Sequence, residues 1–244
     1  MRPDCIIVIP TYNEAENIAG LIQQIISEPR FGVLVVDDNS PDGTARIVQE
    51  IANQCEQVKL LSRPKKEGLG MAYIAGFEQA LSEGGDFIFQ MDADFSHNPV
   101  YLPGLLAAVE TDCDLAIGSR YVEGGSTTDW GLLRRALSKF ANFYSRKILG
   151  MPVNDCTSGF RCYRRSVLEN IGLGSIFSNG YSFLVELTFR TLLNKHRIVE
   201  IPIIFPDRNV GRSKMRKRDV LEAIIAVWRL RFSYGRIKKR ANLH

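Results

Sequence analysis

Residues 87–94 read Phe-Ile-Phe-Gln-Met-Asp-Ala-Asp, a short apolar run that ends in two aspartates. The largely apolar run 87–91 predicts a short buried strand, and two aspartates follow at the point where that strand ends. Comparable runs recur along the first half of the chain. They cover residues 6–9, 33–36, 58–61 and 115–117.

Amphipathic helical patterns fill the intervals between these runs. They cover residues 14–27, 43–54, 69–81 and 99–109. Apolar strands that alternate with such helices are typical of βαβ units. The sequence therefore predicts an α/β domain with a mostly parallel sheet flanked by helices.

The second half of the chain is less regular. Residues 118–132 are rich in glycine, serine and threonine and predict a mobile loop. Helical patterns follow over residues 133–149 and 181–193, and a strand pattern over residues 198–205. We find no internal repeat, so we expect these elements to belong to the same domain as the first half.

Composition narrows the class of protein. Of the 244 residues, 45% are hydrophobic and 24% are charged, which is ordinary for a globular protein with a buried core. No apolar run approaches the roughly 18–20 residues needed to span a bilayer, and no signal-peptide pattern follows Met1. The five cysteines are odd in number and lack CxxC spacing, so they predict reduced cytosolic thiols.

Positive charge is concentrated at the carboxyl end of the chain. Residues 205–244 carry twelve Lys or Arg and three Asp or Glu, a local charge of +9. Because the whole chain has a formal charge of +4, the other residues sum to −5. A strongly apolar helix is predicted over residues 219–232, with basic residues on both sides. We expect one domain over residues 1–215 and a basic amphipathic tail over residues 216–244, which would meet a membrane surface or nucleic acid.

Polar, acidic turns follow three of the predicted strands. They are Pro10-Thr11-Tyr12-Asn13-Glu14, Asp37-Asp38-Asn39-Ser40 and Asp92-Ala93-Asp94. Parallel strands place their carboxyl ends at one edge of a sheet, where α/β proteins bind ligands, so we expect these turns to converge. Any one of them alone could equally hold helix caps and turn formers. That alternative explains all three less well, because a cap needs one oxygen and not paired carboxylates.

Two common nucleotide-binding motifs are absent. No Gly-x-Gly-x-x-Gly follows the first strand, and the chain has no Walker-type Gly-Lys-Ser. The two aspartates of the third turn can instead offer oxygens to one hard cation, Mg²⁺ or Mn²⁺, which commonly also binds a substrate diphosphate. Basic residues in or beside later loops are either phosphate ligands or solvated surface charges. They are Arg120, Arg134, Arg208 and Lys214.

Together these residues resemble the dolichol-phosphate (polyprenol-phosphate) mannose synthases, which are family 2 glycosyltransferases with the Rossmann-like GT-A fold. The matching segments run from Pro10 to Lys214. Besides the three acidic turns they are Pro41-Asp42-Gly43-Thr44, Gly68-Leu69-Gly70, Gly118-Ser119-Arg120-Tyr121, Thr157-Ser158-Gly159-Phe160-Arg161 and Asp207-Arg208…Ser213-Lys214. The Asp-Ala-Asp form and the late Arg and Lys point to the mannose synthase branch of the superfamily.

The resemblance implies a donor side at the carboxyl ends of the strands. The guanosine of the donor would be held by Pro10, Tyr12, Glu14, Val36 and Asp38. The diphosphate and a Mg²⁺ or Mn²⁺ ion would be bound by Asp92, Ala93 and Asp94. Ser96 would be a further metal ligand, although some relatives have glutamine there and the shorter serine leaves room for a water.

The resemblance also implies an acceptor side. Donor or acceptor phosphates would contact Arg120, Arg208 and Lys214. The lipid phosphate would lie near Arg134 and Ser138. The catalytic residues would be Asp92, Asp94 and Arg120.

The implied reaction is an inverting transfer of mannose from GDP-mannose to dolichyl or polyprenyl phosphate, which gives polyprenyl-phosphate mannose and GDP. The acidic turns do not discriminate between bases, so a lipid-phosphate transferase that uses UDP-glucose or UDP-N-acetylglucosamine is the alternative. A phosphate acceptor is largely ionised near neutral pH and needs no strong general base, so positioning and electrostatics suffice. This fits the lack of a well-placed histidine, and we expect a capping or packing role for His97.

The basic tail gains a role from this reaction. Its basic flanks and Trp228 suit a helix that lies in the plane of a membrane surface, where each Lys or Arg contributes about 1 kcal/mol. We expect a cytoplasmic protein, peripheral on the cytosolic face of a membrane, with a small membrane-anchoring subunit as a partner of the kind that some relatives use. The alternative is a helix packed on the domain with a disordered basic end. We expect no nucleic-acid partner, because aromatic residues are not interleaved with the basic ones.

Overall fold

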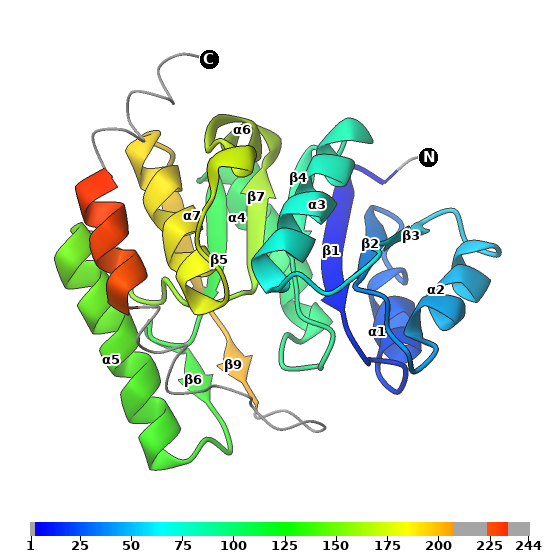
Figure 1. The fold of residues 1–244 in the computed structure, drawn as a ribbon, viewed down its shortest axis with the longest axis horizontal. Helices are drawn as coiled ribbons and strands as arrows, with labels where there is room; N and C mark the ends of the chain where they lie inside the picture. The colour runs from blue at the N-terminus through cyan, green and yellow to red at the C-terminus, as the bar shows by residue number, and fades with distance from the viewer. Residues whose placement is uncertain (1–2, 207–223, 234–244) are drawn as a thin grey trace.

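The computed structural model describes residues 3–206 and 224–233. A seven-stranded sheet crosses the molecule in the order β3-β2-β1-β4-β7-β5-β8 (Figure 1). Its strands are β1 (Cys5–Thr11), β2 (Phe31–Asp37), β3 (Val58–Ser62), β4 (Phe87–Gln90), β5 (Leu115–Ser119), β7 (Arg161–Arg164) and β8 (Ile198–Pro202). Neighbours pair in parallel except at β7, which is antiparallel to β4 and β5. The predicted α/β class and mostly parallel sheet are confirmed.

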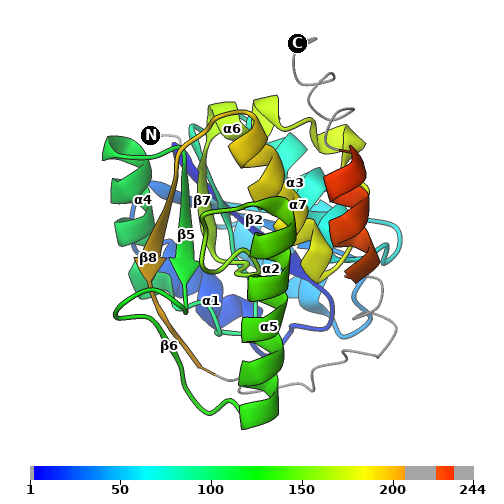
Figure 2. The same ribbon diagram turned by 90° about the vertical axis from the view of Figure 1, so that its left-hand side faces the viewer.

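Helices cover both faces of this sheet (Figures 1 and 2). They are α1 (Ile18–Ile25), α2 (Thr44–Ala52), α3 (Leu69–Ser82), α4 (Leu102–Thr111), α5 (Leu132–Leu149), α6 (Arg165–Asn170) and α7 (Tyr181–Leu193), with short 3-10 turns η1 (Pro99–Tyr101) and η2 (Leu173–Ser175). Side chains alternate along β1: Ile6 and Val8 pack with α3 and α7, whereas Ile7 and Ile9 pack with α1 and α4. Burial on both faces explains why the strands are continuously apolar in the sequence.

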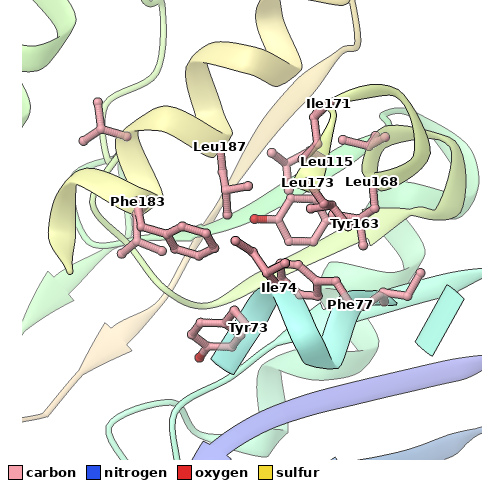
Figure 3. Packing of buried hydrophobic residues seen from close by; sticks show 14 of the residues in the cluster. Tyr73, Ile74, Phe77, Leu115, Tyr163, Leu168, Ile171, Leu173, Phe183 and Leu187 are labelled. Atoms are coloured by element: carbon pink, nitrogen blue, oxygen red, sulfur yellow. The ribbon is translucent and has the colours of Figure 1, made fainter. Parts of the chain in front are cut away.

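Aromatic residues join α3 and α7 to the sheet (Figure 3). The Tyr73 ring lies parallel to the Phe183 ring of α7, with centroids 6.2 Å apart, and stacks on Phe77 at 5.7 Å. Phe77 meets Tyr163 of β7 edge-on at 5.6 Å. All four side chains are fully buried. This packing fixes the first turns of α3, which contribute Tyr73 to the site described below.

Strand β7 and helix α6 were not predicted from the sequence, and β7 is the one that lies next to the site. Two of its four residues are arginines, which is not the pattern of a buried strand. Arg161 is nevertheless fully buried, because its Nε donates to Ser158 O at 2.7 Å and its Nη2 to Cys156 O at 2.9 Å. Since β7 is antiparallel, its first residues lie at the edge where β4 and β5 end.

The segments around β5 and β8 also differ from expectation. The strand predicted over residues 198–205 is two strands, β8 and β9 (Ile204–Phe205). β9 pairs with β6 (Ser126–Thr127), which lies inside the segment predicted to be a loop. The five cysteines are free thiols, as expected.

Residues 224–233 form a helix beside α5 and α7 (Figures 1 and 2). Val227 and Leu230 are buried in the core, and Tyr144 of α5 donates from its hydroxyl to Ile224 O at 3.4 Å. Among the described helices, none combines the length and the apolar character needed to cross a bilayer. The predicted boundary between residues 215 and 216 lies outside the described residues.

Candidate active site

The carboxyl ends of β1, β2 and β4 meet at one edge of the sheet, as predicted. Parallel pairing places Pro10 opposite Val36 and Thr11 opposite Asp37. The Thr11 hydroxyl donates to Asp37 Oδ1 at 2.8 Å, which fastens the two strand ends together. β4 pairs with the other side of β1, so the turn that begins at Asp92 lies next to the turn that follows Pro10.

Asp38 forms a buried ion pair with Arg63 beside this edge. Arg63 Nη1 donates to Asp38 Oδ1 at 2.6 Å, and its Nη2 donates to Glu67 at 2.7 Å. Burial raises the pKa of Asp38, and the Arg63 guanidinium acts in the opposite direction. Arg63 was not among the predicted site residues, although it directly follows β3 at the same edge. The rule applied to the other strand ends would have found it.

The turn after β1 carries Tyr12 and Glu14. The Tyr12 ring is 38% exposed, and Lys66 Nζ lies 3.7 Å from its centroid. Glu14 accepts a hydrogen bond from Asn17 Nδ2 at 2.9 Å, and its backbone N–H donates to the Thr44 hydroxyl at 3.0 Å. The turn is therefore tied to the start of α2 and presents an aromatic ring to solvent.

Asp92 is held from two directions. The Tyr73 hydroxyl donates to Asp92 Oδ1 at 2.9 Å, and the Asp92 N–H donates to His97 Nδ1 at 2.9 Å. Burial, and then the charge of Asp92, raise the pKa of Tyr73 well above its usual value, so its hydroxyl stays protonated. The His97 ring is buried and stacks on Phe160 at 4.9 Å. This is a packing role of the kind expected for His97.

Asp94 lies in a tight turn with Ser96. The Ser96 hydroxyl donates to Asp94 Oδ1 at 2.5 Å, and the Ser96 N–H donates to the same oxygen at 3.1 Å. Phe95 between them adopts a left-handed φ of 60°. Ala93, Asp94 and Ser96 are all buried. The Ser96 oxygen therefore lies against the Asp94 carboxylate, where a third ligand was predicted.

The donor set of this turn fits a hard divalent cation, because it offers two carboxylates and a hydroxyl. Gly159, just before β7, keeps the space beside Asp92 open: a Cβ there would lie 3.9 Å from both Asp92 carboxylate oxygens and 3.4 Å from His97 Cε1. Across residues 3–206 and 224–233, no group of three or more His, Cys, Asp or Glu side chains could hold a metal. Two carboxylates are the complement that Mg²⁺ commonly takes when substrate phosphates complete its shell.

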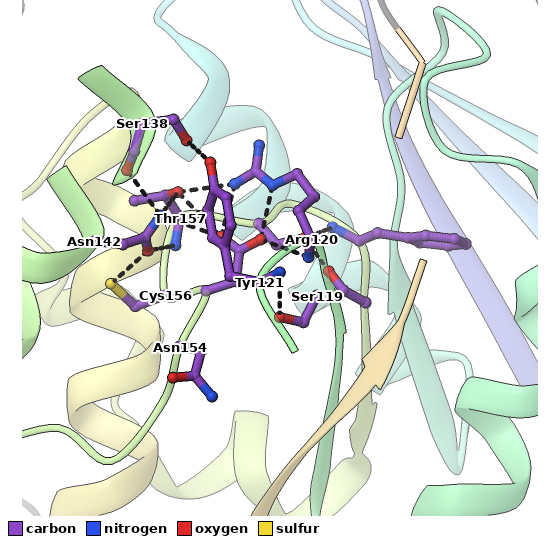
Figure 4. Close-up of polar contacts among 12 residues, drawn as sticks. Ser119, Arg120, Tyr121, Ser138, Asn142, Asn154, Cys156 and Thr157 are labelled. Carbon is purple, nitrogen blue, oxygen red and sulfur yellow. Dashed lines mark hydrogen bonds and ion pairs between the residues drawn. The ribbon is translucent and has the colours of Figure 1, made fainter. Parts of the chain in front are cut away.

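Arg120, which directly follows β5 and is labelled in Figure 4, forms an ion pair with the buried Asp155. Its Nε and Nη2 donate to the two Asp155 oxygens, both at 2.7 Å, and Nη2 also donates to Thr157 at 2.9 Å. Burial opposes the guanidinium charge, but the Asp155 carboxylate outweighs it and the pKa of Arg120 is raised. Asp155 was not among the predicted site residues, because it lies in a polar turn that no predicted strand precedes.

Two aromatic rings connect Arg120 with the predicted acceptor residues of α5. The Trp130 centroid lies 4.0 Å from Arg134 Cζ and 5.4 Å from Arg120 Cζ. The Tyr121 hydroxyl donates to Ser138 Oγ at 2.7 Å, as Figure 4 shows, and its ring centroid lies 5.4 Å from Arg120 Cζ. Arg120, Arg134 and Ser138 are therefore brought together.

Phe205 of β9 connects this basic cluster with the acidic turn. Its ring lies 5.5 Å from the His97 ring and 5.6 Å from the Trp130 ring, and Arg120 Cζ lies 5.3 Å from its centroid. The acidic and basic groups are thus two sides of one site. The other predicted phosphate ligands, Arg208 and Lys214, lie outside the described residues.

Comparisons with known proteins identify the family of this chain. Residues 6–172 match the family model described as glycosyl transferase family 2. The chain is 45% identical over 230 residues to the polyprenol monophosphomannose synthase of Mycolicibacterium smegmatis, which covers 93% of this chain and 87% of the relative. It is 44% identical over 241 residues to the undecaprenyl-phosphate mannosyltransferase of Micrococcus luteus, with coverage of 97% and 98%.

Solved structures share the fold at lower sequence identity. The glucosyl-3-phosphoglycerate synthase of Mycobacterium tuberculosis, in complex with Mn²⁺, UDP and phosphoglyceric acid, has a TM-score of 0.65 at 21% identity, over 94% of this chain and 78% of that one. A mannosyltransferase of Pyrobaculum calidifontis, in complex with GDP-Man and Mn²⁺, has a TM-score of 0.52 at 14% identity, over 100% and 74%. The fold is thus that of a GT-A glycosyltransferase. The chain belongs to glycosyltransferase family 2 and, within it, to the polyprenol-phosphate mannose synthases, as the sequence resemblance predicted.

Proposed function

We propose that this protein transfers mannose from GDP-mannose to the phosphate of a polyprenyl or dolichyl lipid, with inversion at the anomeric carbon. The observation that carries the proposal is the contact, through Phe205, between an acidic turn suited to a metal-bound diphosphate and a basic cluster suited to a phosphate acceptor. The names of the two relatives support mannose as the sugar and a polyprenyl phosphate as the acceptor.

On the donor side, the guanosine would lie against Pro10 and Val36, beside the Tyr12 ring and within reach of Glu14. Asp38 would recognise the base, because an ionised carboxylate can accept from two neighbouring N–H groups of guanine. The Arg63 guanidinium holds that carboxylate in place.

The diphosphate would lie against Asp92, Ala93 and Asp94. Both carboxylates, with the Ser96 hydroxyl, would hold Mg²⁺ or Mn²⁺, which when bound neutralises the charge that develops on the diphosphate as the sugar leaves. Tyr73 and His97 keep Asp92 in place, one through its carboxylate and one through its backbone. These contacts fix the turn before the substrate arrives, which reduces the reorganisation needed during the reaction.

On the acceptor side, Arg134 and Ser138 would bind the lipid phosphate, with Arg120 between acceptor and donor. Arg208 and Lys214 would add further phosphate contacts. The acceptor oxygen is already negatively charged near neutral pH, so it can attack the anomeric carbon directly. His97 is not placed to act as a base, because its Nδ1 accepts from Asp92 and its ring is buried under Phe160. Attack from the face opposite the departing GDP inverts the configuration.

Exposed apolar side chains on α5 and on residues 224–233 support a peripheral place on a membrane. They are Leu132, Leu133, Leu137, Phe140, Phe143, Ile225, Trp228 and Phe232. The two helices lie side by side (Figures 1 and 2), and amphipathic helices with basic residues bind membrane interfaces in this way. We propose that this surface meets the cytosolic face of the membrane that carries the lipid acceptor, with a small membrane-anchoring subunit as an additional partner.

A donor and acceptor assay tests this function. The purified protein is incubated with Mg²⁺ or Mn²⁺, polyprenyl phosphate and one of GDP-mannose, UDP-glucose or UDP-N-acetylglucosamine, and the glycolipid is analysed by mass spectrometry. Only GDP-mannose should give product, and NMR of that product should show the anomeric configuration opposite to the donor's. Product from a UDP-sugar alone would refute the mannose assignment, and a retained configuration would refute the direct displacement.

A further inference from the structure

A cavity of about 460 Å³ lies between α5 and the segment that runs from β5 into β6. Helix α5 contributes Arg135, Lys139, Asn142 and Arg146 to its lining. These residues recur three or four positions apart, so they share one face of the helix. The predicted acceptor residues, Arg134 and Ser138, each precede one of them by one position. They therefore lie on the neighbouring face, roughly 100° around the helix.

The cavity is positively charged. Four lining residues are basic, Arg120, Arg135, Lys139 and Arg146, and none is acidic. Asp155 behind the wall neutralises Arg120, but no carboxylate of the described residues forms an ion pair with Arg135, Lys139 or Arg146. The charge that faces the cavity is thus about three positive units without a counterion in the described part of the chain.

The nearby Glu200 does not provide that counterion. Its carboxylate accepts from the Asn154 N–H at 2.7 Å, from the Asp155 N–H at 2.8 Å and from the Ser119 hydroxyl at 2.7 Å. It is therefore occupied in holding the strand end and the turn behind the cavity wall.

Arg135, which lines the cavity, carries a side-chain donor without a partner in the described structure. Its Nη2 donates to Thr127 O at 2.9 Å, but its Nε is buried and has no hydrogen-bond partner within the described structure. Buried donors of charged groups are normally satisfied. An anion with several oxygens in the cavity would neutralise Arg135, Lys139 and Arg146 together.

The surroundings of the cavity indicate where that anion comes from. Phe143 lines the cavity, yet its side chain is 58% exposed, and Phe140 and Leu132 of the same helix are 57% and 83% exposed. A phosphate group in the cavity would therefore lie beside the apolar side chains of the proposed membrane surface.

We propose that this cavity binds the phosphate of an anionic membrane-lipid headgroup, separately from the acceptor phosphate at Arg134 and Ser138. Such a lipid would hold α5 at the bilayer with the acceptor face directed at its substrate. The inference rests on the proposed membrane association, and it does not depend on which sugar is transferred.

A soluble lipid probe tests the site in the absence of the electrostatic attraction of a membrane surface. Dihexanoyl phosphatidylglycerol, kept below its micelle concentration, is titrated by calorimetry into the full-length protein and into Lys139→Gln, Arg146→Gln and Lys147→Gln. Lys147 is the matched control, since it is an exposed lysine on α5 that does not line the cavity. Lys139→Gln and Arg146→Gln should each weaken binding about tenfold, whereas Lys147→Gln should bind like the unmodified protein.

Two further measurements distinguish a lipid headgroup from free phosphate and from the lipid acceptor. Inorganic phosphate should compete only weakly with the lipid, and the KM for polyprenyl phosphate in detergent should be the same for Lys139→Gln and for the unmodified protein. No binding of the probe, or an equal loss in Lys147→Gln, would overturn the proposal. A raised KM with unchanged probe binding would show instead that the cavity belongs to the acceptor, and equal affinity for inorganic phosphate would show a free-phosphate site. Unaltered transfer activity in any of these outcomes would leave the proposed function standing.

Discussion

The two sides of the candidate active site are formed by different structural elements. The acidic side consists of strand ends, and its carboxylates are fixed by short hydrogen bonds, from Tyr73 to Asp92 and from Ser96 to Asp94. The basic side consists of a helix and connecting segments. There, aromatic rings separate the cations, and one buried ion pair, Arg120 with Asp155, anchors them.

The two sides should therefore respond differently to substitution. A strand end is held by the sheet, so replacing a carboxylate there should remove chemistry more than stability. The basic side depends on a buried charge pair, so replacing one of its members should remove stability as well.

The largest effect is expected from Asp94→Ala. Asp94 is proposed to hold the metal that neutralises the diphosphate, so its loss should lower kcat about 10³-fold, the order of rate that one preorganised electrostatic group contributes. Steady-state transfer assays measure it, and EDTA should have the same effect on the unmodified protein. Asp86→Ala, at the amino end of the same strand, is the control and should keep full activity. Full activity of Asp94→Ala, or in EDTA, would contradict the metal site.

On the basic side, Asp155→Asn should destabilise the fold. It leaves the Arg120 guanidinium buried without a counterion, which typically costs about 3–5 kcal/mol of unfolding free energy. Urea titration followed by circular dichroism measures the change. The double variant Arg120→Met/Asp155→Asn removes both charges and should recover a large part of the loss. If the single variant is as stable as the unmodified protein, the pair is not the anchor of this side.

The contrast also explains what could be predicted from the sequence. Apolar strands and the carboxylates after them follow local rules, so the sheet and the turn at Asp92 and Asp94 were found in advance. Asp155 and β7 were not, because their burial depends on partners distant in the chain. Arg161 is a buried strand residue only because backbone carbonyls of the preceding turn receive its guanidinium.

A smaller effect is expected from Tyr73→Phe, which tests whether the acidic side is preorganised. The variant keeps the stacking on Phe183 but removes the hydrogen bond to Asp92. Contacts of this kind behind a metal ligand contribute about 10–100-fold in metal affinity. Mn²⁺ binding measured by electron paramagnetic resonance is the readout. Tyr163→Phe is the matched control, because Tyr163 is equally buried but its hydroxyl donates to Gln90. An equal loss in both variants would indicate a general packing effect.

The smallest effect is expected from Asp38→Asn, which tests whether the acidic side also recognises the guanine base of the donor. An amide has one acceptor oxygen, whereas a carboxylate has two. GDP affinity should therefore fall about tenfold while UDP affinity stays the same. Stability should fall less than in Asp155→Asn, because Arg63 keeps a second carboxylate partner, Glu67, when the Asp38 charge is removed. Burial raises the pKa of Asp38, so GDP binding to the unmodified protein should weaken as the pH falls through that raised pKa, where the carboxylate becomes protonated and loses an acceptor. Calorimetry with GDP and UDP across this pH range measures both effects. In Asp38→Asn the pH dependence of GDP binding should disappear. If it persists, another group recognises the guanine base, and the acidic side binds the diphosphate alone.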